Sequence, residues 1–568
     1  GVPMRLDKTY GFDDTFTRIT GRSTWKFGGN FQPVRFGPDQ PNFTNGRYSF
    51  NGQYSGNAMA DLLLGKPSNL QYLIERENQK TYFLGFFVQN DLRLTSRLTL
   101  NLGVRYHYEQ PNHKVDGTEG NFIPGFRSTR FPNAPLGMAY YGDPGVPRGL
   151  IHPDRNNFGP RVGLAWDVFG DGRTGLRAGY GVFTQPGLNG IAQGLGLVQP
   201  FLPILNLSTL TSFSEPFQGG QGFNVWPGHP LESYNPETGK GVFTNPVTGW
   251  SANPNLRNPY VQQYSLSIQR QLPQDMALEL SYMGNVGRKL TYFSQQNPAI
   301  YGPGATLANT ESRRTYDPKE VASMYYADSG SNSSFNALAV TLRKRFSRSY
   351  MLDMTYTWMR SLDEYSTPMY WGPNLITDPY NRHDDWGLSD YNRSHVFVMS
   401  GVWNLPTLST LPRPVRTVAG GWELSGLLQL ESGMPFNVFS GRDNSLTAVG
   451  RDRADVIGDP KLPTDRARKD LIAQFFNPAA FTANTPGSFC TSGRNALVGP
   501  GLVNVNTGVY KNFKVLERHE FQFRTEFFNL FNRPNFANPV STLTSPAFGR
   551  IQSTMGARQI QFALKYAF

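Results

Sequence analysis

The sequence predicts an all-β fold, an antiparallel transmembrane β-barrel, from three observations. About 15 segments alternate apolar and polar residues, the connections between them alternate between short and long, and no run of ~18 apolar residues exists to form a transmembrane helix. The final segment is the clearest, because Ile560, Phe562, Leu564, Tyr566 and Phe568 share one parity while polar or small residues occupy the other. Side chains alternate across a strand, so this segment has one apolar face and one polar face.

The length of the final segment also fits a membrane crossing. Residues 558–568, at ~3.3 Å per residue and a tilt of about 40°, rise roughly 27 Å, close to the apolar band of an outer membrane. A solvent-facing edge strand this apolar would promote aggregation, whereas a strand that closes a barrel in lipid would not.

The first half of the chain contains three predicted hairpins, in which alternating segments flank short polar or glycine-containing turns. The first segment is weakly patterned, and the others alternate clearly. The predicted pairs are 8–19 with 25–31 around Thr20 and Gly21, 81–93 with 97–109 around Thr95 and Ser96, and 158–169 with 173–183 around Gly170, Asp171 and Gly172.

The second half continues the pattern with four more hairpins and the final strand. Aromatic residues lie near the ends of several of these segments, as is typical of transmembrane strands. The predicted pairs are 261–272 with 276–284 across residues 273–275, 335–346 with 350–360 across 347–349, 395–405 with 421–430 across a proline-rich turn, and 503–515 with 519–530 across 516–518.

Long connections separate these hairpins, and they all fall on one side of the predicted sheet. Short periplasmic turns and long extracellular loops are the expected asymmetry of an outer-membrane barrel. A soluble β-sandwich also alternates, but it does not explain long loops that all lie on one side. The long connections are roughly 111–157, 186–258, 294–333, 363–392, 432–500 and 533–556.

Composition agrees with one large domain. The 568 residues show no break or linker, and the mean hydropathy of −0.44 is compatible with a barrel, which needs apolar residues only at alternate positions. The net charge is +12, but Lys and Arg are scattered rather than clustered, so we expect no nucleic-acid partner. Cys490 is the single cysteine, which excludes an intrachain disulfide.

Several stretches, in the same order along the chain, resemble the Oar-like TonB-dependent receptors of the bacterial outer membrane. The matching stretches are TWKFGGNF (24–31), GNAMADLLLG (56–65), FGPRVGLAWDVFGDGRTGLRAGYGVF (158–183), NPYVQQYSLSIQRQL (258–272), LELSYMGNVGRKL (278–290), SDYNRSHVF (389–397), GWELSGLLQLESGMPF (421–436), EFFNLFNRPNF (526–536) and RQIQFALKYAF (558–568).

The resemblance implies a barrel of 22 strands, of which about 15 are visible here, preceded by a carboxypeptidase-regulatory-like domain and a plug that contacts TonB. An odd strand number also departs from the even counts of bacterial barrels. Neither a plug, a TonB box nor a signal peptide is recognisable in the sequence. We therefore expect residues 1–568 to be an outer-membrane barrel, located in a Gram-negative cell, that lacks the plug and the first strands.

The sequence offers no catalytic or cofactor-binding motif. It contains no G-x-S-x-G, H-E-x-x-H, Walker A or C-x-x-C pattern, and its seven histidines have no metal-ligand spacing. His107 lies on the inward parity of a strand, where we interpret it as a lumen residue. The glycine-rich stretch 187–196 lacks the strand and helix context of a phosphate loop, so we expect a flexible loop there. We expect a protein that is not an enzyme and has no cofactor.

Two acidic, Asn-rich segments are the candidate cation sites. Residues 378–390 and 441–459 contain several carboxylates close in sequence, as a Ca²⁺ site requires, but neither follows the EF-hand register. The favoured alternative is that Asp and Asn form local turns and that Arg442, Arg451 and Arg453 pair with the acids.

The inward parity of the strands provides candidate lumen-facing residues. Charged groups there keep their hydration and could tune selectivity toward an anionic or polar solute, although plain hydration of the wall is the favoured interpretation. Four loop tryptophans, Trp226, Trp250, Trp371 and Trp386, could line a binding surface or pack a loop core. The charged candidates are Arg105, Arg177, Arg343, Arg524 and Lys565, accompanied by Glu109, Asp353 and Glu526.

Aromatic residues at the strand ends are expected to form the interfacial girdle. Tyr566 and Phe568 end the chain and resemble the C-terminal signal that the barrel-assembly machinery recognises. The girdle candidates are Tyr106, Tyr108, Tyr180, Trp358, Phe531, Tyr566 and Phe568.

The expected function is capture of an extracellular ligand by the long loops and its passage through the lumen, with energy supplied by TonB through the plug. The partners would be outer-membrane lipid, the assembly machinery, TonB and the ligand, whose identity the sequence does not indicate. Two alternatives remain: a loop-rich surface protein for adhesion, secretion or envelope structure, and a passive porin, which the long loops make less attractive.

Overall fold

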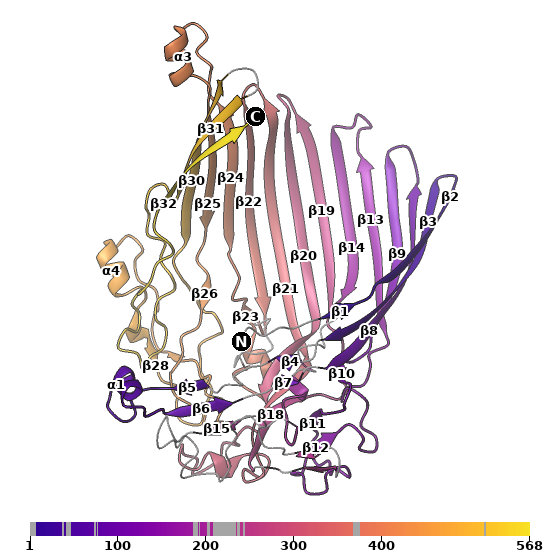
Figure 1. The fold of residues 1–568 in the computed structure, drawn as a ribbon, viewed down its shortest axis with the longest axis vertical. Coiled ribbons are helices and arrows are strands. Elements are labelled where there is room, and N and C mark those ends of the chain that lie inside the picture. Colours follow the sequence, from indigo (N-terminus) through magenta and orange to yellow (C-terminus); the bar gives the residue numbers. More distant parts are fainter. Residues whose placement is uncertain are drawn as a thin grey trace.

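The computed structural model describes most of the chain and places it in one large antiparallel sheet with a layer of loops at one end (Figure 1). The described residues are 7–36, 39–40, 47–72, 75–76, 78–185, 191, 194–201, 205–207, 234–235, 239–241, 243, 245–366, 375–515 and 519–568.

Among the described residues, nineteen strands form the main sheet, and fifteen of them are long strands that pair in sequence order, each antiparallel to the next. This number equals the number of strands that the sequence predicts. In order, they are β2 (Phe12–Thr20), β3 (Ser23–Phe36), β8 (Gln79–Arg93), β9 (Leu98–Glu109), β13 (Asn157–Asp167), β14 (Thr174–Thr184), β19 (Tyr260–Leu272), β20 (Met276–Gln295), β21 (Val321–Ser347), β22 (Tyr350–Asp363), β24 (His395–Asn404), β25 (Trp422–Glu431), β30 (Leu502–Val515), β31 (His519–Phe528) and β32 (Gln559–Ala567).

Short strands extend the main sheet or form small sheets of their own. The extensions are β1 (Lys8–Thr9), β10 (His113–Lys114), β18 (Val247–Ala252), which is parallel to β21, and β23 (Gly387–Leu388). The small sheets are β4 (Asp39–Gln40) with β7 (Glu75–Arg76), β5 (Arg47–Ser49) with β6 (Asn69–Tyr72) and β15 (Leu205–Leu207), β11 (Gly120–Phe122) with β12 (Met138–Tyr140), β16 (Tyr234–Asn235) with β17 (Lys240–Gly241), β26 (Pro435–Phe436) with β29 (Leu497–Val498), and β27 (Asp455–Val456) with β28 (Phe481–Thr482).

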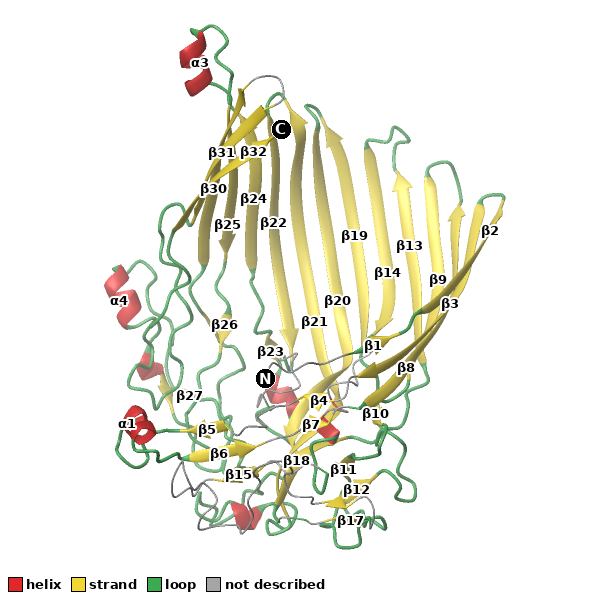
Figure 2. Ribbon diagram, viewed as in Figure 1, coloured by secondary structure: helices red, strands yellow, loops and turns green. Residues whose placement is uncertain are grey.

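Helices are few and lie beyond the ends of the long strands (Figure 2). None of the described helices has the length and apolar character needed to cross a bilayer as a helix. The α-helices are α1 (Ala58–Leu63), α3 (Arg413–Ala419) and α4 (Arg468–Ala473), and 3-10 turns cover Glu311–Arg313, Arg382–Asp385 and Pro478–Ala480.

The pairing register places the apolar residues of neighbouring strands on one face of the sheet. Leu266 of β19 pairs with Ala178 of β14 and with Tyr282 of β20, while the adjacent Ser265 pairs with Gly179 and Met283. Leu266 and Tyr282 are 45% and 44% exposed although they are large and apolar. An apolar face of this extent has its natural surroundings in lipid, so the long strands span a membrane.

The hydrophobic core lies mostly at the end of the sheet where the long loops gather, and there the loops pack against one another and against the ends of β18, β20 and β21 (Figure 1). Three clusters of buried side chains form there. The first includes Leu150, Ile151, Leu256 and Phe293; the second includes Phe122, Phe131, Tyr140 and Met324; the third includes Phe436, Phe476, Phe481 and Leu497. The long loops therefore fold into a packed layer with its own cores.

Two strands are much longer than the sequence predicts. β20 continues to Gln295 and β21 begins at Val321, whereas alternation predicts strands only over 276–284 and 335–346. The prediction of a loop over 294–333 was therefore wrong for residues 294–295 and 321–333. The extra residues mix polar Asn285 and Ser333 with buried Phe293 and Met324, and they lack apolar alternation because this end of the hairpin packs against the loops.

β2 and β32 lie at the two ends of the pairing order, and within the described residues no pairing joins them. Both strands are exposed along their whole length. Each has one edge of backbone N–H and C=O groups that finds no strand partner in the described part of the chain.

The two faces of β19 should respond oppositely to a charge. We predict that Leu266→Arg lowers the unfolding free energy by about 2–4 kcal/mol, because the guanidinium would face hydrocarbon near the middle of the strand. The measurement is urea unfolding of the protein in lipid bilayers, followed by the loss of the heat-modifiable band.

Ser265→Arg is the matched control, because it adds the same group to the next residue on the opposite face. It should change the unfolding free energy by less than ~1 kcal/mol. Equal effects of the two substitutions would contradict the assignment of the faces.

Candidate functional site

The face of the sheet opposite to the apolar one carries every charged residue that the sequence predicts to face the lumen. Arg177 pairs with Ala165 and Ser267, and Arg343 pairs with Ala277 and Asp353. Following the register across neighbouring strands places Arg105, Arg177, Arg343, Arg524 and Lys565 on the face opposite to the apolar one.

Some of these charges are paired along the wall. Arg343 lies 3.2 Å from Asp353 and 3.9 Å from Glu279, and Tyr510 donates a 3.1 Å hydrogen bond to Glu526. The Arg524 guanidinium lies over the Tyr510 ring at 5.9 Å. These exposed pairs contribute little to stability, so they mainly hold a hydrated polar wall.

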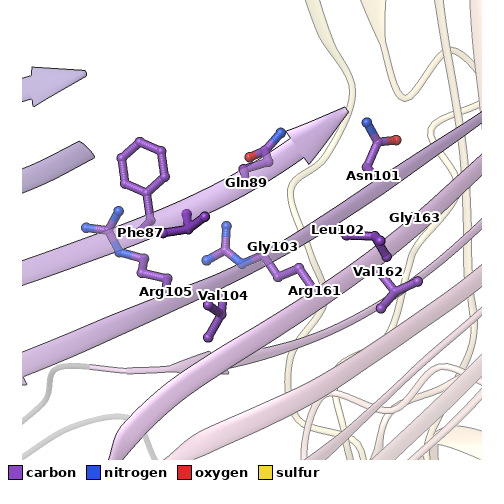
Figure 3. Close-up of a pocket in the computed structure, with 11 residues that line it drawn as sticks. Phe87, Gln89, Asn101, Leu102, Gly103, Val104, Arg105, Arg161, Val162 and Gly163 are labelled. Carbon is purple, nitrogen blue, oxygen red and sulfur yellow. The ribbon is translucent and has the colours of Figure 1, made fainter. Parts of the chain in front are cut away.

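A cavity of about 410 Å³ lies against this wall at β8, β9 and β13. Arg105 donates a hydrogen bond to Asn30 and lies over the Phe87 ring at 6.0 Å. Arg161, which the sequence analysis did not single out, lies on the same face and lines the same cavity. Figure 3 shows the side chains of Phe87, Gln89, Asn101, Arg105 and Arg161 on one side of the strands and those of Val104 and Val162 on the other.

A second cavity of about 420 Å³ adjoins the first and shares Arg161. The Arg161 guanidinium lies over the Phe183 ring at 4.6 Å, opposite Gly181 in the register. A Cβ on Gly181 would come within 2.9 Å of that ring, so glycine leaves room for the aromatic and the guanidinium. Neither cavity has an Asp or Glu in its lining, so this sector of the wall is basic.

The two acidic loop segments meet around buried arginines. Arg453 pairs with Asp385 and donates hydrogen bonds to the Thr377 hydroxyl at 2.9 Å and to the Asp384 carbonyl at 2.8 Å. The side chains of Arg453 and Asp385 are only 4% and 5% exposed. Asp378 accepts a 2.8 Å hydrogen bond from the Tyr380 N–H, and this bond closes a local turn. Arginine pairing and turn formation thus account for acids considered as Ca²⁺ ligands.

Arg494 is a second such residue, and the sequence analysis missed it. It pairs with Asp363, 131 positions away, and with Asp390 at 3.0 Å. No local motif could have revealed this contact, because the partners come from different loops. Of the three arginines proposed to pair with these acids, Arg453 pairs with Asp385, Arg451 lies over the Phe439 ring at 5.5 Å, and Arg442 is exposed.

Only some of the loop tryptophans and glycines that the sequence singles out lie within the described residues. Trp226, Trp371, Gly187 and Gly190 lie outside the described residues. The Trp250 ring packs edge-on against Phe293 at 5.2 Å, so it belongs to a loop core, whereas Trp386 is 40% exposed. A Cβ on Gly194 would lie 3.0 Å from the Trp250 ring, so the expectation of a flexible loop was wrong at this position, which is closely packed.

The remaining sequence candidates occupy structural positions. His107 stacks on Phe83 at 6.1 Å, on the inner parity. Tyr566 stacks on Phe521 at 4.8 Å and on Phe568 at 5.6 Å, at the end of β32. Within the described residues, no group of three or more His, Cys, Asp or Glu side chains is arranged to hold a metal ion.

An apolar outer face, a hydrated inner face and a one-sided loop layer define an outer-membrane β-barrel protein. The chain belongs to the family described as "Outer membrane beta barrel domain", whose model matches residues 3–561. This membership confirms the predicted fold class and location, the outer membrane of a Gram-negative cell.

Solved structures of longer proteins resemble the chain. They include the outer membrane transporter YddB from Escherichia coli (TM-score 0.48, 10% identity, covering 99% of this chain and 54% of that one). Others are a mutant of the ferric enterobactin receptor PfeA from Pseudomonas aeruginosa in complex with enterobactin (0.49, 10%, 99% and 54%) and the ferripyoverdine receptor of the P. aeruginosa outer membrane (0.46, 11%, 99% and 48%).

The chain therefore spans about half the length of these structures. With TM-scores below 0.5, they indicate no ligand for this chain. A search of curated proteins found no match.

The buried pair between the acidic segments should be important for the loop layer. We predict that Arg453→Ala destabilises the packing of residues 375–392 by roughly 3–5 kcal/mol, because Asp385 would remain buried without its cation. Limited proteolysis of the folded protein should show faster cleavage in this segment.

Arg442→Ala is the control, since this arginine lies in the same loop but is exposed. It should leave the cleavage rate unchanged. If Arg453→Ala also left it unchanged, Asp385 would not depend on Arg453.

A buried carboxyl group makes one loop sensitive to pH. Glu119 accepts hydrogen bonds from the N–H groups of Lys114 at 2.9 Å and Gly149 at 3.2 Å. Burial nevertheless raises the pKa of Glu119 from 4.5 to about 7. Because the unfolded segment loses this proton first, the contribution of Glu119 to stability is greatest at acidic pH and falls as the pH rises from 4.5 to about 7.

We predict that the free energy of local unfolding of residues 114–150 in the wild-type protein, minus the same free energy in Glu119→Gln, falls by about 3 kcal/mol over this pH range. Hydrogen exchange of the two proteins at each pH gives this difference. Asp116→Asn, which neutralises an exposed neighbour, should keep most of this pH dependence, because burial rather than the Asp116 charge is the main cause of the raised pKa of Glu119. A wild-type minus Glu119→Gln difference that stays constant with pH would contradict the raised pKa.

Proposed function

We propose that the chain is the barrel of an outer-membrane receptor and transporter, which captures an extracellular ligand with its loop layer and passes it through the lumen. In this proposal, the energy comes from TonB, acting through a plug that is not among these 568 residues. The resemblance to Oar-like TonB-dependent receptors supports this part, and the protein performs no covalent chemistry.

The observation that carries the proposal is the division of the molecule into two parts. The loop layer has three hydrophobic cores of its own, so it presents a folded surface to the exterior. The membrane-spanning part presents a polar wall toward its interior. A packed surface joined to a hydrated path is what capture and passage of a solute require.

The basic sector around Arg105 and Arg161 supports a polar or anionic solute. Two adjoining cavities meet at Arg161, their linings contain amides and aromatic rings, and neither contains a carboxylate. Guanidinium groups in this setting bind anions through charge-assisted hydrogen bonds. Arg343, in contrast, is already engaged with Asp353.

We also propose that further strands close the sheet between β2 and β32. Both edge strands are exposed along their length, and an open sheet edge does not persist within hydrocarbon. The even strand number of bacterial barrels and the resemblance, which implies about 22 strands, support the same conclusion. Tyr566 and Phe568, at the end of β32, would then be recognised by the barrel-assembly machinery.

The second candidate function is a surface protein for adhesion, secretion or envelope structure without energised uptake. The packed loop layer fits it as well as it fits capture of a solute. The polar, cavity-lined inner wall favours transport, because a surface module needs only the loops.

Comparison of spent growth media tests the proposal. Mass spectrometry should identify an anionic solute that wild-type cells deplete, and that cells deleted for this gene or for TonB do not. Replacing both Arg105 and Arg161 with Gln should slow its depletion about tenfold, because two charge-assisted contacts are lost.

Arg343→Gln serves as the control and should deplete the solute at the wild-type rate. If gene deletion changes no solute but impairs adhesion or secretion, the surface-protein function replaces uptake. Rapid swelling of liposomes in small sugars would indicate a passive pore.

A further inference from the structure

The loop layer contains a cavity of about 770 Å³ around α4, larger than either cavity on the inner wall. Three segments enclose it: residues 460–476, which include α4, residues 496–501, which precede β30, and residues 533–536, which follow β31. We name it the α4 pocket. α4 lies at the periphery of the loop layer (Figure 1).

The floor of the α4 pocket is apolar and firmly supported. Phe475, Phe476 and Leu497 line the pocket and also belong to or pack against the third hydrophobic cluster. A Cβ on Gly499 would lie 1.9 Å from the Asn538 side chain, so the backbone at Gly499 is in close contact with Asn538. The pocket is therefore preformed, as small-molecule sites usually are.

The sides of the pocket are basic. Lys461, Arg466, Arg468 and Arg533 line it, and its lining includes no Asp or Glu. Arg466 links the two ends of residues 463–475, because it donates hydrogen bonds to the carbonyls of Pro463 at 2.8 Å, Gln474 at 2.8 Å and Phe475 at 3.2 Å.

The other three cations are available to a ligand. Within the described residues, the side chains of Lys461, Arg468 and Arg533 form no ion pair or hydrogen bond. The nearby acids Asp465 and Asp470 are exposed and do not line the cavity. Unneutralised cations beside an aromatic floor complement a molecule that has an anionic group on an apolar body.

We propose that the α4 pocket binds an anionic amphiphile, with a phosphate or carboxylate at Arg468 and Arg533 and its apolar part on Phe475 and Phe476. The same chemistry occurs in an anionic membrane lipid and in a soluble aromatic or acyl phosphate. The site goes beyond the proposed function, because binding there requires neither TonB nor passage through the lumen.

The experiment uses the full-length outer-membrane protein, in nanodiscs of neutral lipid, and a photoactivatable benzyl phosphate that contains a diazirine. The matching benzyl alcohol is the neutral probe. Peptide mass spectrometry should locate the phosphate probe in residues 460–476, 496–501 or 533–536, with the alcohol labelling these peptides several-fold less.

Combined Arg468→Ala and Arg533→Ala substitution should lower labelling about tenfold, because two charge-assisted contacts are lost. Lys469→Ala is the matched control, since Lys469 lies on α4 with the same charge but does not line the pocket. It should label as the wild type does. Ala496→Trp, which fills the cavity and keeps every charge, should also abolish labelling. If the double variant fails to fold, this second variant tests whether the probe binds in the α4 pocket.

Competition identifies the source of the ligand. Protection by phosphatidic acid in the nanodisc indicates a membrane lipid, and protection by phenyl phosphate in the buffer indicates a soluble ligand; either result supports the site. The proposal is overturned if neither competitor protects, if the alcohol labels equally well, or if the folded double variant labels as the wild type does. Loss of uptake in cells would not affect this outcome, so the two proposals fail separately.

Discussion

The structure depends on the absence of water in the hydrocarbon layer, where every backbone N–H and C=O must find a partner in the protein. Neighbouring antiparallel strands provide these partners, and they do so from β2 through to β32. Once the backbone is paired in this way, alternate side chains must face lipid and lumen. The apolar side chain of Leu266 and the hydroxyl of the adjacent Ser265 are therefore consequences of one requirement.

The loop layer follows a different rule, because it lies in water and must bury its own apolar residues. Its three hydrophobic clusters and its buried ion pairs bring together segments that are far apart in the sequence, such as Arg494 and Asp363. The division has a functional meaning. A membrane-spanning wall of simple pattern carries a folded exterior whose cavities and charges determine what the protein binds.

Local pattern predicts the membrane-spanning part of the fold well, since lipid imposes the same alternation on each strand. It predicted fifteen long strands, and the register of these strands places Arg105, Arg177 and Lys565 on the face opposite to the apolar one. It failed for the continuations of β20 and β21, which pack against the loops and lack apolar alternation. Arg161 was missed although its parity in strand β13 marks it as inward, so the signal was present.

The loop layer could not be predicted in the same way, because its contacts are non-local. The pairing of Arg453 with an acid was expected, but the choice of Asp385 depends on how two loops pack. Nor does any motif mark the α4 pocket, whose basic residues come from segments 460–468 and 533–536. The sequence shows which residue types the loops contain, but the packing of the loops determines which of these residues are in contact.

The most direct test of the central claim is the accessibility of spin labels placed one at a time at residues 262–268 of β19, after Cys490 has been replaced. Dissolved oxygen concentrates in lipid, whereas a nickel chelate stays in water. We therefore expect the accessibility of the label to each reagent to alternate with a period of two residues along the strand. Labels at Gln262, Tyr264, Leu266 and Ile268 should favour oxygen, and those at Gln263, Ser265 and Ser267 should favour the chelate. Equal accessibility along the strand, or the opposite phase, would contradict it.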